Sequence, residues 1–130
     1  AARAYLCVDS LEHLRRGGRI GDAQAFVGAA LAIKPILEIA GGRLVARDKV
    51  RTASRAVERL VALGVQAAAE LGGSVEIGVH HAGARDKAET IAAAIGKALP
   101  AMPVVTTDLG AVLTAHAGPG SVALVISPLL

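Results

Sequence analysis

Three glycine pairs divide this chain into short segments, and they limit its fold more than any other feature of the sequence. The pairs are Gly17-Gly18, Gly41-Gly42 and Gly72-Gly73. Glycine adopts backbone conformations that other residues avoid, so a glycine pair ends a helix or turns the chain. The middle pair separates two short apolar stretches, residues 36–39 and 43–46, which we expect to form a β-hairpin.

The spacing of apolar residues predicts further elements between these glycines. Alternation is typical of half-buried strands, and a spacing of three and four residues is typical of helices. The expected strands cover residues 5–8, 36–39, 43–46, 75–81, 104–106, 112–114 and 122–126. The expected helices cover residues 11–17, 23–31, 52–71 and 86–99. This order predicts a single α+β domain with two layers, in which helices cover one face of a mixed β-sheet. The other face would then meet another domain, another copy of the chain or a lipid.

The composition limits the class of protein. Hydrophobic residues make up 53% of the 130 residues, but there is one Phe, one Tyr and no Trp, so we expect an aliphatic core. With few aromatic side chains and a net charge of +3, nucleic acid is not an expected partner. No apolar run approaches the ~20 residues that span a bilayer, and the first residues do not resemble a secretion signal. We therefore expect a cytoplasmic protein without an integral membrane segment.

Basic residues are concentrated in one part of the chain. Six of the 14 Lys and Arg residues lie between residues 43 and 59. Arg51, Arg55 and Arg59 are spaced four apart and would form one basic stripe on a helix. Such a stripe is either a solvated helix face or a docking surface for an acidic partner or a phosphorylated substrate.

Two glycine-rich segments contain the candidate binding residues. In Gly17-Gly18-Arg19, backbone N–H groups next to a guanidinium could hold a carboxylate or a phosphate, although a plain helix-ending loop would have the same sequence. In the second segment, the imidazole of His116 can bond a carboxylate, while Gly118 and Gly120 let a ligand approach the backbone. An ordinary turn with an exposed histidine is the alternative.

The sequence contains no pattern that predicts catalysis or metal binding. No serine lies in a nucleophile motif, and no Walker or dinucleotide motif is present. His80 and His81 are adjacent on an expected strand, so they face opposite sides and cannot easily bind one metal. The lone Cys7 has apolar neighbours and is expected to be a buried thiol. We predict no catalytic residue, no cofactor and no metal.

Several separated motifs, in the same order, make the whole chain similar to the smaller C-terminal domain of the DegV family of fatty-acid-binding proteins. They are Val8-Asp9-Ser10-Leu11-Glu12-His13-Leu14-Arg15-Arg16-Gly17-Gly18-Arg19-Ile20, Ile33-Lys34-Pro35-Ile36-Leu37, Gly41-Gly42, Lys49-Val50-Arg51-Thr52 and His116-Ala117-Gly118-Pro119-Gly120. The resemblance implies an N-terminal α/β domain that this chain does not contain, so we interpret the chain as a fragment or as a short form.

The resemblance also implies a ligand and a partner. Family members in bacteria bind a long-chain fatty acid between their two domains and present it to a fatty-acid kinase, which phosphorylates the carboxylate. His116 corresponds to the family's head-group histidine. Arg19 and Arg51 are expected near the head group, the phosphate or the kinase. Phe26, Leu31, Ile33 and Ile36 are expected to line the apolar groove, although each would also suit the protein core.

Two other functions remain open for this sequence. The glycine loops could form a phosphate-binding half-site of an enzyme, or the basic stripe could dock an acidic protein without any catalysis. If one half of the family's fold occurs alone, its exposed apolar face predicts self-association into a homo-oligomer.

Overall fold

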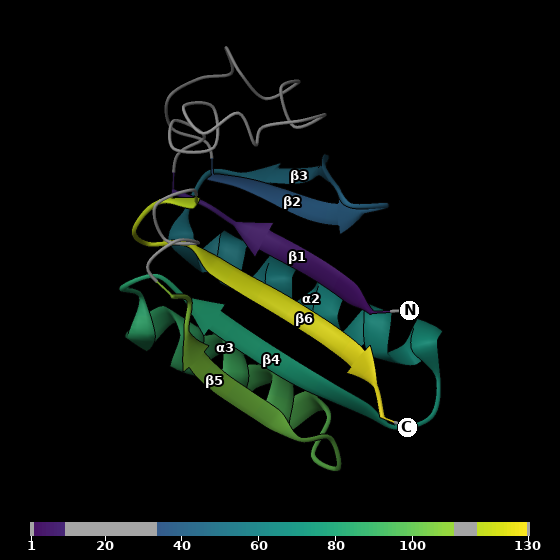
Figure 1. The fold of residues 1–130 in the computed structure, drawn as a ribbon. Coiled ribbons are helices and arrows are strands. Elements are labelled where there is room, and N and C mark those ends of the chain that lie inside the picture. Colours follow the sequence, from purple (N-terminus) through teal and green to yellow (C-terminus); the bar gives the residue numbers. More distant parts are fainter. Residues whose placement is uncertain (1, 10–33, 111–116, 130) are drawn as a thin grey trace.

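The computed structural model of the chain describes residues 2–9, 34–110 and 117–129. These residues form six strands and two helices (Figure 1). In chain order they are β1 (Arg3–Cys7), β2 (Lys34–Ala40), β3 (Arg43–Val50), α2 (Ala53–Leu71), β4 (Val75–His81), α3 (Arg85–Ala98), β5 (Val104–Asp108) and β6 (Val122–Pro128).

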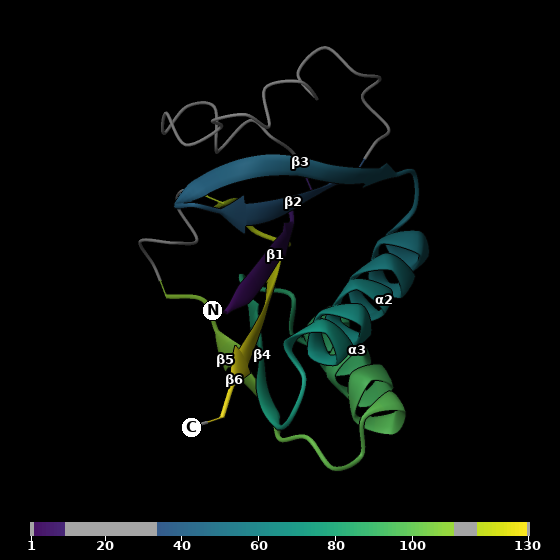
Figure 2. The ribbon, with the colours of Figure 1, turned by 90° about the vertical axis from the view of Figure 1, so that its right-hand side faces the viewer.

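The described strands form one mixed sheet in the order β3-β2-β1-β6-β4-β5. β4 and β5 are parallel, and the other neighbouring strands are antiparallel. Figure 2 shows α2 and α3 on the same face of the sheet. The predicted α+β fold, a two-layer mixed sheet with helices on one face, is confirmed.

The predicted elements agree with the structure except at their ends. Gly41 and Gly42 have φ angles of 59° and 76° and form the turn of the predicted hairpin. β3 continues to Val50, four residues beyond its predicted end. The side chain of Thr52 caps α2 by accepting a hydrogen bond from the backbone N–H of Arg55 at 3.1 Å. The helices expected at residues 11–17 and 23–31 and the strand expected at 112–114 lie outside the described residues.

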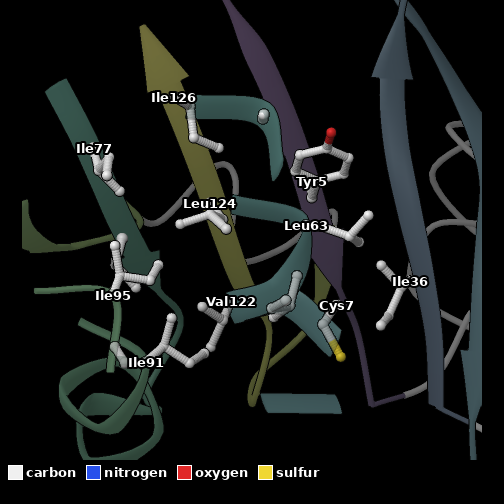
Figure 3. Packing of buried hydrophobic residues seen from close by; sticks show 14 of the residues in the cluster. Tyr5, Cys7, Ile36, Leu63, Ile77, Ile91, Ile95, Val122, Leu124 and Ile126 are labelled. Atoms are coloured by element: carbon white, nitrogen blue, oxygen red, sulfur yellow. The ribbon is translucent and has the colours of Figure 1, made fainter. Parts of the chain in front are cut away.

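The main hydrophobic core lies between the helices and the sheet, and apart from Tyr5 it is aliphatic as predicted (Figure 3). Ile36, a candidate groove residue, is buried in this core. Leu63 of α2, Ile91 and Ile95 of α3 and Leu124 of β6 are almost completely buried in it. Cys7 is also completely buried here, which confirms the prediction of a buried thiol. Because burial disfavours a charged sulfur, the pKa of Cys7 is raised and the thiol stays protonated.

Gly64 lies where α2 packs closely against the sheet. A Cβ atom added there would lie 2.9 Å from Cδ2 of Leu124 and 3.5 Å from Cδ1 of Ile95. The missing side chain therefore allows α2 to pack against both β6 and α3.

A second, smaller apolar cluster lies on the opposite face of the sheet. Its buried members are Leu6, Val8, Leu37 and Ala117. Strand alternation places Ile39 and Val105 on this face too, and each is 47% exposed. The two described helices do not cover this face. Neither of them is long and apolar enough to cross a membrane.

An ion pair at one end of the sheet connects β1 to the end of α2. The guanidinium of Arg3 donates a 2.7 Å hydrogen bond to the carboxylate of Glu70. This bond lowers the pKa of Glu70, and a second bond from Gln66 lowers it further.

We expect the Arg3–Glu70 pair to stabilise the fold at neutral pH and to be lost in acid. Because the folded-state pKa of Glu70 is lowered, the stabilisation is present above the pKa of the unfolded chain and disappears as the pH falls through the folded-state pKa. An NMR titration of the Glu70 carboxyl should show its midpoint rising in Arg3→Met. An unchanged midpoint would contradict this account.

Candidate functional site

Three of the segments that carry the predicted motifs, residues 34–37, 49–52 and 117–120, have residues at one end of the sheet. The strand registers pair Cys7 with Val122, Lys34 with Val50, and His81 with both Val122 and Asp108. The last residues of β1, β3, β4 and β5 and the first residues of β2 and β6 therefore lie at the same end. This end also includes the loop of residues 117–121, which we call the glycine loop.

The glycine loop has a backbone that requires glycine. Gly118 and Gly120 have φ angles of 90° and 87°, a region that side chains disfavour. The N–H of Gly120 donates to the carbonyl of Ala82 at 2.7 Å. The buried hydroxyl of Ser121 lies 2.9 Å from the carbonyl oxygen of Ala117 and 2.7 Å from that of Gly118. The segment at Gly118 and Gly120 thus forms a turn, which is held by contacts of Ser121 within the loop and by the bond from Gly120 to Ala82.

Three charged side chains lie beside the glycine loop. The ammonium of Lys87, from the first turn of α3, donates to the carbonyl of Gly120 at 2.9 Å. It also lies 3.6 Å from Oδ1 of Asp9, and Lys34 lies 3.6 Å from the same oxygen. We call Asp9, Lys34 and Lys87 the charged cluster.

Asp9 packs directly against the backbone of the glycine loop. A Cβ atom at Gly120 would collide with the Asp9 carboxylate, and its carboxyl carbon would be 2.9 Å away. The absence of a side chain at Gly120 therefore lets the charged cluster contact the loop.

The prediction that Arg51 shares a helical stripe with Arg55 and Arg59 is wrong. α2 begins at Ala53, so Arg51 lies before the helix, exposed in the bend after β3. Strand pairing extends β3 to Val50, and Thr52 already caps the helix, which explains why the helical spacing fails there.

The other two arginines of the expected stripe have acidic partners. Arg59 bonds Asp48 at 2.6 Å, and Arg55 lies 3.6 Å from Glu58. Much of the basic charge of this region is thus paired with acidic side chains. Arg51 lies at the same end of the sheet as the glycine loop.

The two adjacent histidines point to opposite faces of the sheet, as predicted. Nδ1 of His80 lies 2.6 Å from the hydroxyl of Thr107. Nδ1 of the buried His81 accepts a hydrogen bond from the backbone N–H of Ala84 at 3.2 Å, which holds the start of α3. In the described part of the chain, no three His, Cys, Asp or Glu side chains gather as metal ligands.

Several predicted site residues cannot be placed. Gly18, Arg19, Phe26, Leu31, Ile33 and His116 lie outside the described residues. Of the predicted site, the structure brings Gly118 and Gly120 to the end of the sheet where Arg51 also lies.

Sequence reasoning did not identify the charged cluster. Asp9 and Lys34 lie within two of the motifs quoted above, but nothing in their spacing indicates a contact between them. Lys87 belongs to no motif, and only the packing of α3 brings it to Gly120.

Comparisons with known proteins agree with this architecture. The family model described as uncharacterised protein, DegV family, matches residues 1–129. A DegV domain-containing protein of Streptomyces coelicolor is 46% identical over 125 residues, which cover 95% of this chain and 44% of that protein. The chain thus spans less than half the length of this relative.

Solved structures show the same fold. A fatty acid binding DegV family protein from Streptococcus agalactiae matches 99% of this chain and 45% of its own, with 33% identity and a TM-score of 0.90. A DegV family protein from Thermus thermophilus, whose description states fatty acid binding, matches 98% of this chain and 46% of its own, with 30% identity and a TM-score of 0.86. Family model, sequence relatives and fold agree, and the chain belongs to the DegV family.

Proposed function

We propose that this chain forms one half of a fatty-acid-binding site in a carrier protein. The observation that carries the proposal is the fold: structures that match it with TM-scores of 0.90 and 0.86 are described as fatty acid binding. The chain covers less than half of those structures. In this proposal an N-terminal α/β domain supplies the other half of the site.

The glycine loop is the proposed head-group end of the site. In this proposal His116, the residue before the loop in the sequence, bonds the carboxylate. Gly118 keeps the backbone accessible, and Gly120 shapes the loop beside Asp9. Gly18, Arg19 and Arg51 add donors and positive charge. A carboxylate bonded by an imidazole and by backbone N–H groups is held by several short, charge-assisted bonds.

The apolar tail is proposed to lie along the face of the sheet that the described helices leave free. Ile39 of β2 and Val105 of β5 are exposed on this face, which also carries the buried cluster of Leu6, Val8 and Leu37. Phe26 and Ile33 complete the groove in this proposal. Each buried methylene contributes about 0.8 kcal/mol, so the tail supplies most of the affinity and the loop selects the carboxylate.

The proposed protein is a carrier and not an enzyme. It presents the bound acid to an ATP-dependent fatty-acid kinase in the bacterial cytoplasm, which phosphorylates the carboxylate. No cofactor takes part in holding the ligand. The positive charge of Arg51 and its neighbours fits an acidic surface on that kinase or the phosphate of the product.

Native mass spectrometry tests the proposal on two proteins, this chain alone and the chain joined to an α/β domain. We expect a fatty acid retained on the joined protein only. If neither protein retains lipid and added oleate does not bind, the carrier function is wrong. Phosphate binding in its place would favour an enzyme half-site, and a homodimer of the chain alone would show that its free face self-associates.

We expect His116→Ala to weaken oleate binding about tenfold, because one charge-assisted hydrogen bond to the carboxylate is lost. Titration calorimetry on the joined protein measures the affinity, and the melting temperature should stay unchanged. Oleyl alcohol is the control ligand, since it has no carboxylate and its affinity should not fall. Equal losses of affinity for both ligands would show that His116 does not bind the head group.

A further inference from the structure

The glycine loop is fixed on one side by bonds that involve only main-chain partners and its own serine. Gly120 bonds Ala82, Ala82 bonds the carbonyl of Ser121, and the Ser121 hydroxyl contacts two loop carbonyls. These bonds set the shape of the loop and tie it to the end of β4. They leave the position of the loop relative to β1 and α3 to other contacts.

Lys87 supplies a contact of that kind. Its ammonium bonds the carbonyl of Gly120 across 33 residues of sequence, and its side chain is only 19% exposed. Among the described residues, no other side chain from outside the loop donates a hydrogen bond to it. Because a partly buried ammonium needs polar partners, moving the loop away would leave this charge poorly compensated.

Asp9, just after β1, links the end of that strand to Lys87 and to the glycine loop. Its carboxylate lies 3.6 Å from the Lys87 ammonium and packs where a side chain of residue 120 would otherwise be. One lysine and one carboxylate thus bring the end of β1, the first turn of α3 and the glycine loop together.

We propose that Lys87, with Asp9 as its counter-ion, is a positioning residue that sets the glycine loop for binding the fatty-acid carboxylate. Lys87 acts through the loop and not by touching the ligand. The inference rests on the proposed function and extends it to a residue that no motif contains.

A comparison with Lys34 distinguishes positioning of the loop by Lys87 from simple attraction between positive charge and the carboxylate. It shares the Asp9 carboxylate with Lys87 but makes no bond to the loop in the described structure. If the cluster acted only by its positive charge, Lys34→Met and Lys87→Met would weaken binding of an anion equally. If Lys87 positions the loop, its substitution has the larger effect.

The test is a set of oleate titrations on the two-domain protein. We expect Lys87→Met to weaken binding about tenfold, as for loss of a bond made by a charged group, and Lys34→Met to weaken it much less. Lys87→Arg should restore most of the affinity because a guanidinium can still donate to the carbonyl and to Asp9. Lys97→Met, at the exposed far end of α3, is the matched control and should change nothing.

A double-mutant cycle with His116→Ala shows whether Lys87 acts through the loop. Two residues that act through one contact are not additive. The loss of oleate affinity in the double variant with Lys87→Met should therefore be smaller than the sum of the two single losses. Additive losses, or equal losses in Lys34→Met and Lys87→Met, would overturn the proposal.

Hydrogen exchange of the Gly120 amide separates this inference from the proposed function. Lys87→Met should speed that exchange, since the loop loses an anchor, and Lys97→Met should not. If the unmodified protein fails to bind oleate, the carrier function is wrong whatever this amide shows. If oleate binds but the Gly120 exchange is unchanged in Lys87→Met, the anchoring role of Lys87 is wrong.

Discussion

Replacing Leu124 by alanine should lower the free energy of unfolding by about 4 kcal/mol, the largest effect expected from a single substitution in this domain. Leu124 is completely buried in β6 and packs beneath α2 at Gly64. Truncation removes apolar contacts and leaves a cavity that two helices and a sheet cannot easily close.

Urea unfolding followed by circular dichroism measures this loss in the 130-residue chain. Leu129→Ala is the matched control, because Leu129 is 45% exposed and its truncation should change stability by less than about 0.5 kcal/mol. Similar losses for the two variants would show that Leu124 is not a central part of the core.

Gly64→Val should destabilise the domain by about 3 kcal/mol through overpacking. A Cβ at this position already lies 2.9 Å from Leu124, and valine adds two methyl groups in the same narrow space. α2 would have to move away from β6 and α3, which opens the core on both sides.

Gly96→Val is the control for the change in helix propensity. Gly96 lies in α3, and a Cβ there meets no atom within 4 Å. Valine is a slightly better helix residue than glycine, so this variant should keep or slightly raise the melting temperature. If Gly64→Val were equally harmless, the close approach of α2 to β6 would not be part of the folded state in solution.

The sequence predicts the elements of the fold correctly where turn residues and apolar alternation agree with the packing of the folded chain. The Gly41-Gly42 turn and the apolar alternation of β4 predict their elements directly. The length of β3 was missed for a physical reason. A register shift beside Ile36 interrupts the alternation, and Asp48 pairs with Arg59 of α2. Polar residues that look like a loop in sequence are therefore strand residues in the structure.

Gly64 shows how the same residue can be interpreted in two ways. In the sequence it is a weak point of a helix. In the structure it is the position that lets α2 pack closely against β6. Only the placement of Leu124, sixty residues later in the chain, distinguishes the two interpretations.

The candidate site was only partly predictable. The glycine turn at residues 118–120 follows from composition, because proline between glycines favours a tight turn. Lys87 could not be found in this way, since its bond to Gly120 depends on how α3 packs on the sheet. Contacts between distant segments leave no spacing pattern in a single sequence.

The position of β6 has a consequence for the nascent chain on the ribosome. Among the described strands β6 is the last to be synthesised, yet it pairs with both β1 and β4 and joins the two halves of the sheet. Until it emerges, the β1–β2–β3 half and the β4–β5 half share no strand. The glycine loop directly precedes β6, so this end of the sheet is completed only when β6 has paired with β1 and β4.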